Sequence, residues 1–141
     1  MELAVWVIIL PLLTAFFLGI SKLYFKKFFS PIVIGSAIIY LCLLILVINN
    51  SYPPQVYSIG DWKLLGINLM VDPFSTMFLL IIAILFITVI IFSLKYIEIN
   101  KHRYFIFTYL MIAGIAGMVL TADLFNLYVF LEASSLSSCA L

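Results

Sequence analysis

Apolar residues fill most of the chain in five long runs, and short polar or charged stretches separate them. Each run is close to the roughly 20 residues that an α-helix needs to cross a hydrocarbon core of about 30 Å. The pattern predicts an all-α membrane protein, a single domain over residues 1–141, with about five transmembrane helices. The predicted spans are Leu3–Ile20, Pro31–Ile48, Phe74–Tyr96, Tyr104–Ala122 and Leu124–Leu141.

The composition also favours a bilayer as the solvent. Of the 141 residues, 67% are hydrophobic and 9% are charged, whereas a soluble domain keeps about a quarter of its residues charged. The net charge of +1 says nothing about nucleic acid, but the sequence has no basic tract to bind it, so we do not expect nucleic acid as a partner. No basic residue precedes the first run and no small-residue cleavage site follows it, so we expect this run to remain as a helix rather than to be a cleaved signal.

The basic residues predict how the spans are oriented. Lysines follow the first span, and Lys95 at the end of the third span is followed by Lys101 and Arg103 before the fourth, so both groups face the same side of the membrane. Only Lys63 lies opposite. By the positive-inside rule, the two basic loops are cytoplasmic and the N-terminus is outside. We therefore expect a multi-pass protein of the cell membrane.

The longest irregular stretch, between the second and third spans, predicts a small hairpin at the outer membrane surface. Pro53-Pro54 and Gly60 interrupt helix, while β-branched and aromatic residues around them favour short strands. Trp62 and the tyrosines of this loop suit the interfacial aromatic belt. Asp72 followed by Pro73 predicts the N-cap and the first residue of the third helix. The predicted strand residues are Val56, Tyr57, Ile59, Trp62, Leu65, Ile67 and Leu69.

Two further features of the spans are explained by packing. In the fourth span, Gly114 and Gly117, each beside an alanine, form a small-residue patch that is typical of close helix–helix contact in lipid. The two cysteines, Cys42 and Cys139, lie in apolar segments, and we expect them to be small packing residues. A disulfide framework or a metal site would need more ligands. We expect neither a metal nor a cofactor in this chain.

One acidic residue, Glu132, lies well inside a span. If its helix starts near Asp123, a rise of ~1.5 Å per residue puts Glu132 roughly 14 Å deep, close to the bilayer midplane. A charge there costs at least ~2.5–3.5 kcal/mol, and no basic residue of the sequence lies at that depth; Lys95 is at the end of its span. Either Glu132 is protonated, or a cation, a water chain or a Lys or His of another subunit lies beside it. A proton relay uses a carboxyl group of this kind, whose protonation depends on a movable partner. The alternative is a structural role, in which Glu132 stays protonated and is hydrogen-bonded to a neighbouring helix.

Helical spacing surrounds Glu132 with polar groups. Spacings of three, four and seven place Tyr128, Ser135, Leu136 and Cys139 on its face. The serines on adjacent faces could hold waters or donate to the carboxylate, or they could bond to carbonyls of their own helix. Asp123 and Asn126 lie near the outer end of the fifth span, where we favour a role in capping the helix over a role in ion entry. The supporting residues of the candidate site are Tyr128, Ser135, Ser138, Asn126 and Asp123, with Ser134 and Ser137 nearby.

At these residues the sequence resembles a known family. The run LFNLYVFLE (Leu124–Glu132), followed by Ser135–Ser138 and Ala140-Leu141, resembles the fifth-helix signature of antiporter-like subunits. These are the D-type subunit of multisubunit Mrp cation/proton antiporters and the related membrane subunits of complex I and membrane-bound hydrogenases. A second stretch, Gly60–Ser75, resembles the family's loop and third-helix entry. The match runs over about residues 57–141.

The resemblance implies a role for Glu132 and for partner proteins. In the family, the corresponding glutamate pairs with a lysine on a later helix, and the pair gates proton movement. The sequence resembles only the N-terminal third of such a subunit, so the later helices are not in it. It also has Cys139 where a tyrosine is usual and Ala133 where a larger aliphatic residue is usual.

Two functions follow as hypotheses. In the first, the chain is a subunit of an ion-translocating complex, coupled to Na⁺/H⁺ exchange or to a redox module, and Glu132 transfers protons. In the second, it is a structural or assembly subunit between larger antiporter-like subunits, and Glu132 stays neutral. A free-standing enzyme is disfavoured, because the sequence carries no metal-ligand cluster, nucleotide loop or nucleophile–base arrangement. The expected partners are other membrane subunits, a redox module in some complexes, and the lipid bilayer.

Overall fold

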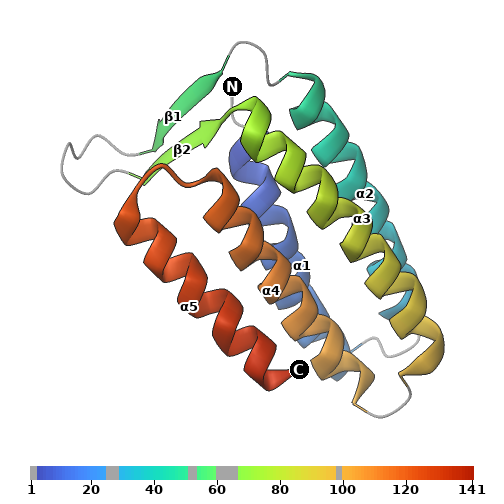
Figure 1. Cartoon of the computed structure of the whole chain (residues 1–141). Helices are drawn as coiled ribbons and strands as arrows, with labels where there is room; N and C mark the ends of the chain where they lie inside the picture. Colours follow the sequence, from blue (N-terminus) through green and yellow to red (C-terminus); the bar gives the residue numbers. More distant parts are fainter. Residues whose placement is uncertain (1–2, 25–28, 51–53, 60–66, 98–99) are drawn as a thin grey trace.

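The computed structural model describes residues 3–24, 29–50, 54–59, 67–97 and 100–141. These residues form a helical bundle with a two-stranded hairpin across one end (Figure 1). The predicted features that involve Tyr52, Gly60, Trp62, Lys63 and Leu65 lie outside the described residues. The elements are α1 (Leu3–Tyr24), α2 (Phe29–Asn49), β1 (Gln55–Ile59), β2 (Ile67–Val71), α3 (Pro73–Tyr96), α4 (Lys101–Leu120) and α5 (Leu124–Ala140).

The helices confirm the predicted all-α membrane fold of a multi-pass protein. Within the described residues, α1 to α4 are each long and apolar enough to cross a membrane. α5 has 17 residues, about 25 Å at 1.5 Å per residue, against a hydrocarbon core of about 30 Å. Its role as a fifth span, like the orientation of the bundle, stays a prediction.

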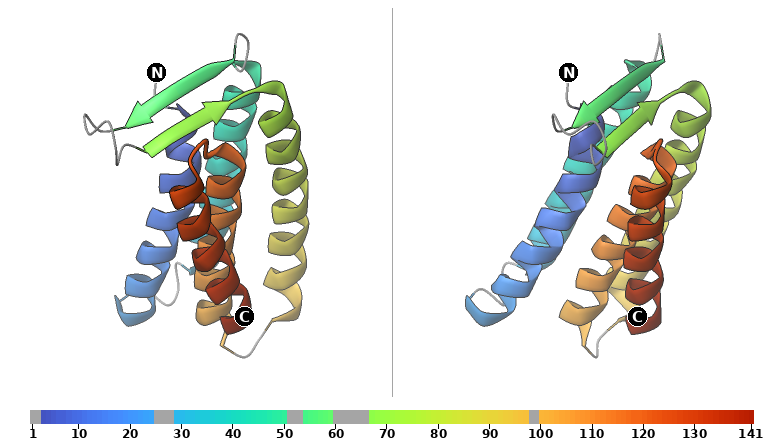
Figure 2. Two further views of the ribbon diagram at one scale, coloured as in Figure 1. Left: turned by 60° about the vertical axis from the view of Figure 1, so that its left-hand side comes forward. Right: turned by 90° about the vertical axis from the view of Figure 1, so that its left-hand side faces the viewer.

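α4 is the central helix of the bundle. It packs against α1 on one side and α5 on another, while α2 lies between α1 and α3. α5 forms one edge of the molecule and α2 with α3 the opposite edge (Figure 1). The hairpin crosses the end at which α1 and α3 begin, and α5 ends at the other end (Figure 2).

The predicted hairpin is present, and its second strand has a further partner. β1 pairs antiparallel with β2, with Tyr57 opposite Leu69. The other edge of β2 pairs with the turn after α4, where the N–H of Ala122 donates to the carbonyl of Asn68 at 2.8 Å. The fourth predicted span reaches Ala122, but α4 ends at Leu120 because this turn is extended and bonded to β2.

α4 also begins earlier than the sequence predicts. The predicted start is Tyr104, but Lys101, His102 and Arg103 already belong to the first turn of the helix. Tertiary contacts hold that turn. The centroids of the His102 and Phe29 rings lie 4.1 Å apart. Lys101 Nζ donates a 2.9 Å hydrogen bond to the carbonyl of Leu94, near the end of α3.

The start of α3 follows the prediction. Asp72 is the N-cap and Pro73 is the first helical residue. The Asp72 carboxylate accepts a 2.7 Å hydrogen bond from the N–H of Ser75, and the Asp72 N–H donates to the Ser75 hydroxyl at 2.9 Å. The hydrogen bonds from the backbone and side chain of Ser75 lower the pKa of Asp72 from its ordinary value, because they stabilise the ionised carboxylate.

Aromatic residues and two hydrogen bonds of the Tyr109 hydroxyl organise the core. The rings of Tyr40 and Tyr109 both lie edge-on to Phe86, at centroid distances of 5.5 and 5.3 Å. The hydroxyls of Tyr109 and Ser36 lie 2.6 Å apart, and the Tyr109 hydroxyl also donates to the carbonyl of Val33 at 3.0 Å. This contact joins α4 to α2 inside the bundle.

The cysteines differ from expectation. Cys42 and Cys139 are free, and both are exposed on the surface of the chain. They lie on helix faces that do not point into the core, so the expectation that they are buried packing residues is wrong for this bundle.

Candidate functional site

Glu132 is the middle residue of α5, because eight helical residues precede it and eight follow it. The helix begins at the N-cap Asp123, whose carboxylate accepts a 3.2 Å hydrogen bond from the N–H of Phe125. The side-chain amide of Asn126 donates to the same carboxylate at 3.3 Å. Asp123 and Asn126 therefore form the cap that the sequence favours.

One face of α5 is fixed by very close contact with α4. Asn126, Ser134 and Ser137 are buried on this face. Opposite them lie the two glycines of α4. A Cβ on Gly114 would come within 2.9 Å of the Cβ of Ser134 and 3.0 Å of backbone atoms of α5, and a Cβ on Gly117 would overlap the ring of Phe130. The small-residue patch is thus the α4–α5 interface, in agreement with the packing interpretation.

Glu132 lies on the opposite face of α5. It precedes Ser134 by two residues, which at 3.6 residues per turn is a rotation of about 200° around the helix axis. Tyr128, one turn earlier, interacts with the Glu132 carboxyl group. The Tyr128 side chain is 61% exposed and Leu136, one turn later, is 67% exposed. Helical geometry therefore places Glu132, which is half-buried, on the side of α5 away from α4. Among the described residues its carboxyl group forms no ion pair with a Lys, Arg or His.

The serine hydroxyls of α5 bond to their own helix. Ser134 donates to the carbonyl of Leu131 at 2.9 Å, and Ser137 donates to that of Ala133 at 2.6 Å. The Ser135 hydroxyl donates to the backbone carbonyl of Glu132 at 3.1 Å rather than to its carboxyl group. Ser138 is exposed. The sequence left open whether these hydroxyls hold water or the carboxylate, or bond to carbonyls of their own helix. Three of them bond to carbonyls of their own helix.

Sequence reasoning missed the buried hydroxyls of the α2–α4 core. Tyr40 and Tyr109 lie in the middle of apolar spans, and their side chains are fully buried. The Tyr40 hydroxyl has no hydrogen-bond partner within the described part of the chain. The sequence did carry a signal for them. A tyrosine in the middle of an apolar span, away from the membrane–water interface, places a polar hydroxyl group where it needs a partner inside the protein. No group of three or more His, Cys, Asp or Glu that could hold a metal is present among the described residues.

The fold and the site define a multi-pass membrane protein with one carboxyl group at the centre of an outward-facing helix. No protein-family model matches the chain. It is 30% identical, over 93% of its length, to the D-type subunit of the Na⁺/H⁺ antiporter of Alkalihalophilus pseudofirmus, and it covers 28% of that protein. It is 34% identical, over 62% of its length, to the N-type subunit of the NADH-quinone oxidoreductase of Desulforudis audaxviator, of which it covers 19%.

A solved structure has the same fold. The chain superposes over its full length on 30% of a chain in the membrane-bound sulfane sulfur reductase, an archaeal respiratory membrane complex, with a TM-score of 0.91 and 29% identity. These findings confirm the resemblance that the sequence predicts. The chain corresponds to part of an antiporter-like membrane subunit of the Mrp and complex I kind, and it spans less than a third of the length of these relatives.

Proposed function

We propose that this chain acts in a multisubunit ion-translocating membrane complex, in which Glu132 transfers protons. The observation that carries the proposal is the position of Glu132, which lies at the centre of α5 on the face turned away from α4. Two relatives of the chain are named as subunits of an Na⁺/H⁺ antiporter and of an NADH-quinone oxidoreductase. The complex would accordingly couple proton movement to cation exchange or to a redox module.

The geometry supports a carboxyl group whose partner lies outside α1–α4. A charged side chain at the centre of a span costs ~2.5–3.5 kcal/mol or more, and α1–α4 lie on the other side of α5. A cationic group or a water chain supplied by another helix or subunit would stabilise the ionised form of Glu132. Removal of that partner would favour the protonated form. Alternation between the two moves one proton per cycle.

The test is a substitution in the assembled complex. Glu132→Gln keeps the size and hydrogen-bonding capacity of the side chain but cannot ionise, so ion translocation by membrane vesicles should fall at least tenfold while a native gel still shows the intact complex. Thr88→Val is the matched control, because Thr88 is an exposed polar residue inside another span whose hydroxyl bonds only to its own helix at 2.8 Å. Translocation at the wild-type rate by an intact Glu132→Gln complex would refute the proposal.

A structural role is the second candidate, and the surface of α5 favours it. Away from α4 the helix exposes large apolar side chains, with Leu124 at 84%, Phe125 at 67% and Leu136 at 67% exposure. Such a face suits contact with a neighbouring membrane subunit. If this is the whole role, removal of the chain should disrupt assembly, while Glu132→Gln should change neither assembly nor translocation.

A further inference from the structure

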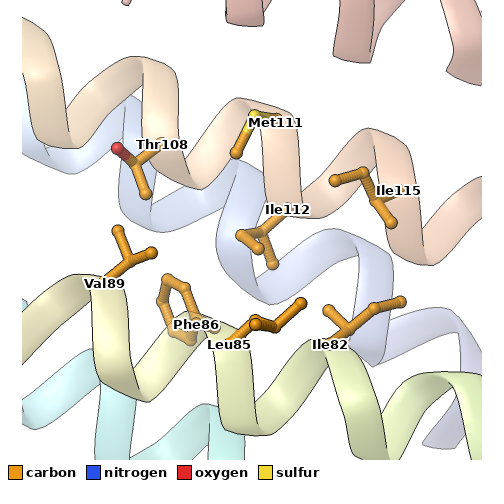
Figure 3. A pocket seen from close by; sticks show the side chains of 8 residues that line it. All are labelled: Ile82, Leu85, Phe86, Val89, Thr108, Met111, Ile112 and Ile115. Atoms are coloured by element: carbon orange, nitrogen blue, oxygen red, sulfur yellow. The ribbon is translucent and has the colours of Figure 1, made fainter.

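An apolar crevice runs between α3 and α4 at the depth of the spans. It is a cavity of about 280 Å³, and side chains of the two helices face each other across it (Figure 3). The hydrogen bond from the Ser93 hydroxyl to the Tyr104 hydroxyl, at 3.0 Å, joins α3 and α4 beyond the Val89–Thr108 end of the crevice. The lining residues are Ile82, Leu85, Phe86, Val89, Thr108, Met111, Ile112 and Ile115.

A second cavity, of about 340 Å³, lies on the outer side of α3 near its end. Between the two cavities α3 presents a ridge of four residues at helical spacings of four, three and four. The members of the ridge are Leu85, Val89, Phe92 and Tyr96. The second cavity is lined by Thr88, Ile91, Phe92, Lys95 and Tyr96. The two spaces therefore flank one ridge. The crevice ends at Val89 and Thr108, whereas the second cavity reaches the end of α3 at Lys95 and Tyr96.

A cationic and aromatic group marks that end. Lys95 and Tyr96 are exposed, and Lys95 Nζ lies 5.9 Å from the centre of the Tyr96 ring. The Tyr96 ring stacks on Phe92, with centroids 4.3 Å apart and an angle of 17° between planes. Tyrosine and lysine are the residues that anchor helices at the membrane–water interface. The sequence predicts this end to be cytoplasmic, and anionic lipids give the cytoplasmic leaflet its negative surface potential.

The side chains of the crevice favour a hydrocarbon chain over a packed helix. Helices approach closely in lipid through small residues, and in this protein Gly114 and Gly117 provide that surface for α5. Of the crevice-lining residues only Thr108, at one end, is among these small residues; the others are long, branched or aromatic. Long and branched side chains hold another backbone at a distance, whereas a flexible acyl chain can fill the irregular space between them.

We propose that this region of α3 and α4 binds one anionic phospholipid. One acyl chain lies in the α3–α4 crevice and the other in the outer cavity, with the α3 ridge between them. Lys95 Nζ and the Tyr96 hydroxyl contact the phosphate of the headgroup. The proposal is independent of proton transfer by Glu132, because it concerns different helices and a different face.

The test uses the assembled complex containing the full chain, depleted of lipid in detergent. Native mass spectrometry would measure the binding of added phosphatidylglycerol and, separately, phosphatidylcholine. We expect Lys95→Gln to weaken phosphatidylglycerol binding about fivefold, the contribution of one lysine near an anionic headgroup. Arg103→Gln is the matched control, since Arg103 is an exposed cation at the same end of the bundle but lines neither cavity; it should leave binding unchanged.

A second pair of variants tests the crevice. Ile112→Phe fills it and should also weaken phosphatidylglycerol binding, whereas Ile84→Phe, on an exposed face of α3 that lines neither cavity, should not. Four results would overturn the proposal: equal binding of the two lipids, equal effects of Lys95→Gln and Arg103→Gln, displacement of the lipid by inorganic phosphate alone, or unchanged phosphatidylglycerol binding by the assembled Ile112→Phe complex. The last result would show that no acyl chain occupies the crevice.

Discussion

Ser134 and Glu132 are two residues apart in α5 and face in opposite directions. Ser134 is buried against Gly114 of α4, whereas Glu132 lies about 200° away around the helix axis. The close fit at Gly114 fixes the rotation of α5 about its own axis, so Glu132 cannot turn inward unless the α4–α5 interface separates. The proposed partner of Glu132 would therefore approach from outside α1–α4.

The outward position of Glu132 predicts how α5 inserts into a membrane when the chain is made without partners. Glu132→Leu should favour insertion by about 3 kcal/mol, the order of the cost of a charged side chain at a helix centre. Ser135→Leu, which changes an exposed neighbour that carries no charge, should favour insertion much less. Glycosylation sites placed after α5 would report the inserted fraction. Equal effects of the two substitutions would show that Glu132 carries no charge penalty there.

The glycines of α4 should tolerate alanine poorly. Gly117→Ala places a methyl group against the Phe130 ring, and Gly114→Ala places one against the backbone of α5, so each should lower the free energy of unfolding in detergent by about 1–3 kcal/mol, the usual cost of overpacking. Gly35→Ala is the control, because a Cβ there meets nothing within 4 Å; alanine should stabilise the helix slightly. Similar stability in all three variants would mean that α5 can shift without loss.

Two buried tyrosines give a matched comparison of hydroxyl groups. Tyr109→Phe removes the hydrogen bonds to Ser36 and to the Val33 carbonyl and should destabilise the bundle by about 0.5–1.5 kcal/mol. Tyr40→Phe removes a buried hydroxyl that lacks a partner among the described residues, so it should be neutral or stabilising. Thermal unfolding of the two variants in the same detergent would decide, and a clear loss of stability in Tyr40→Phe would indicate a buried water bound to that hydroxyl.

The cap of α3 predicts a pH dependence. The pKa of Asp72 is lowered by its hydrogen bonds with Ser75, so its stabilising contribution is present above the ordinary carboxyl pKa and is lost as the pH falls through the lower value of the folded chain. Asp72→Ala should cost about 1 kcal/mol near neutral pH. Asp72→Asn can still cap the helix but does not titrate, so it should remove the loss of stability that Asp72 causes at acidic pH. Unfolding measured between pH 7 and about pH 3 would contradict this if Asp72→Asn and the wild type lost stability in parallel.

Local chemistry predicted several structural features directly. The Asp72-Pro73 pair specified the start of α3 because a capping carboxylate and a fixed proline φ act within a few residues. The small-residue patch around Gly114 predicted a close helix contact, because residues with little or no side chain let a neighbouring helix backbone approach. By contrast, the early start of α4 at Lys101 was missed, because its first turn is held by contacts with α2 and α3 that are distant in sequence.

The bilayer as solvent and the apolar helices follow from the sequence alone, because apolar length is a property of a single segment. The hairpin follows from helix-breaking residues beside strand-forming ones, and the depth of Glu132 stays a prediction from helical rise. The direction in which Glu132 faces depends on tertiary contacts. Spacing along a helix orders residues around its axis but leaves the rotation of the helix free. The contact of Ser134 and Phe130 with Gly114 and Gly117 sets that rotation, because side-chain packing between two helices depends on both of them.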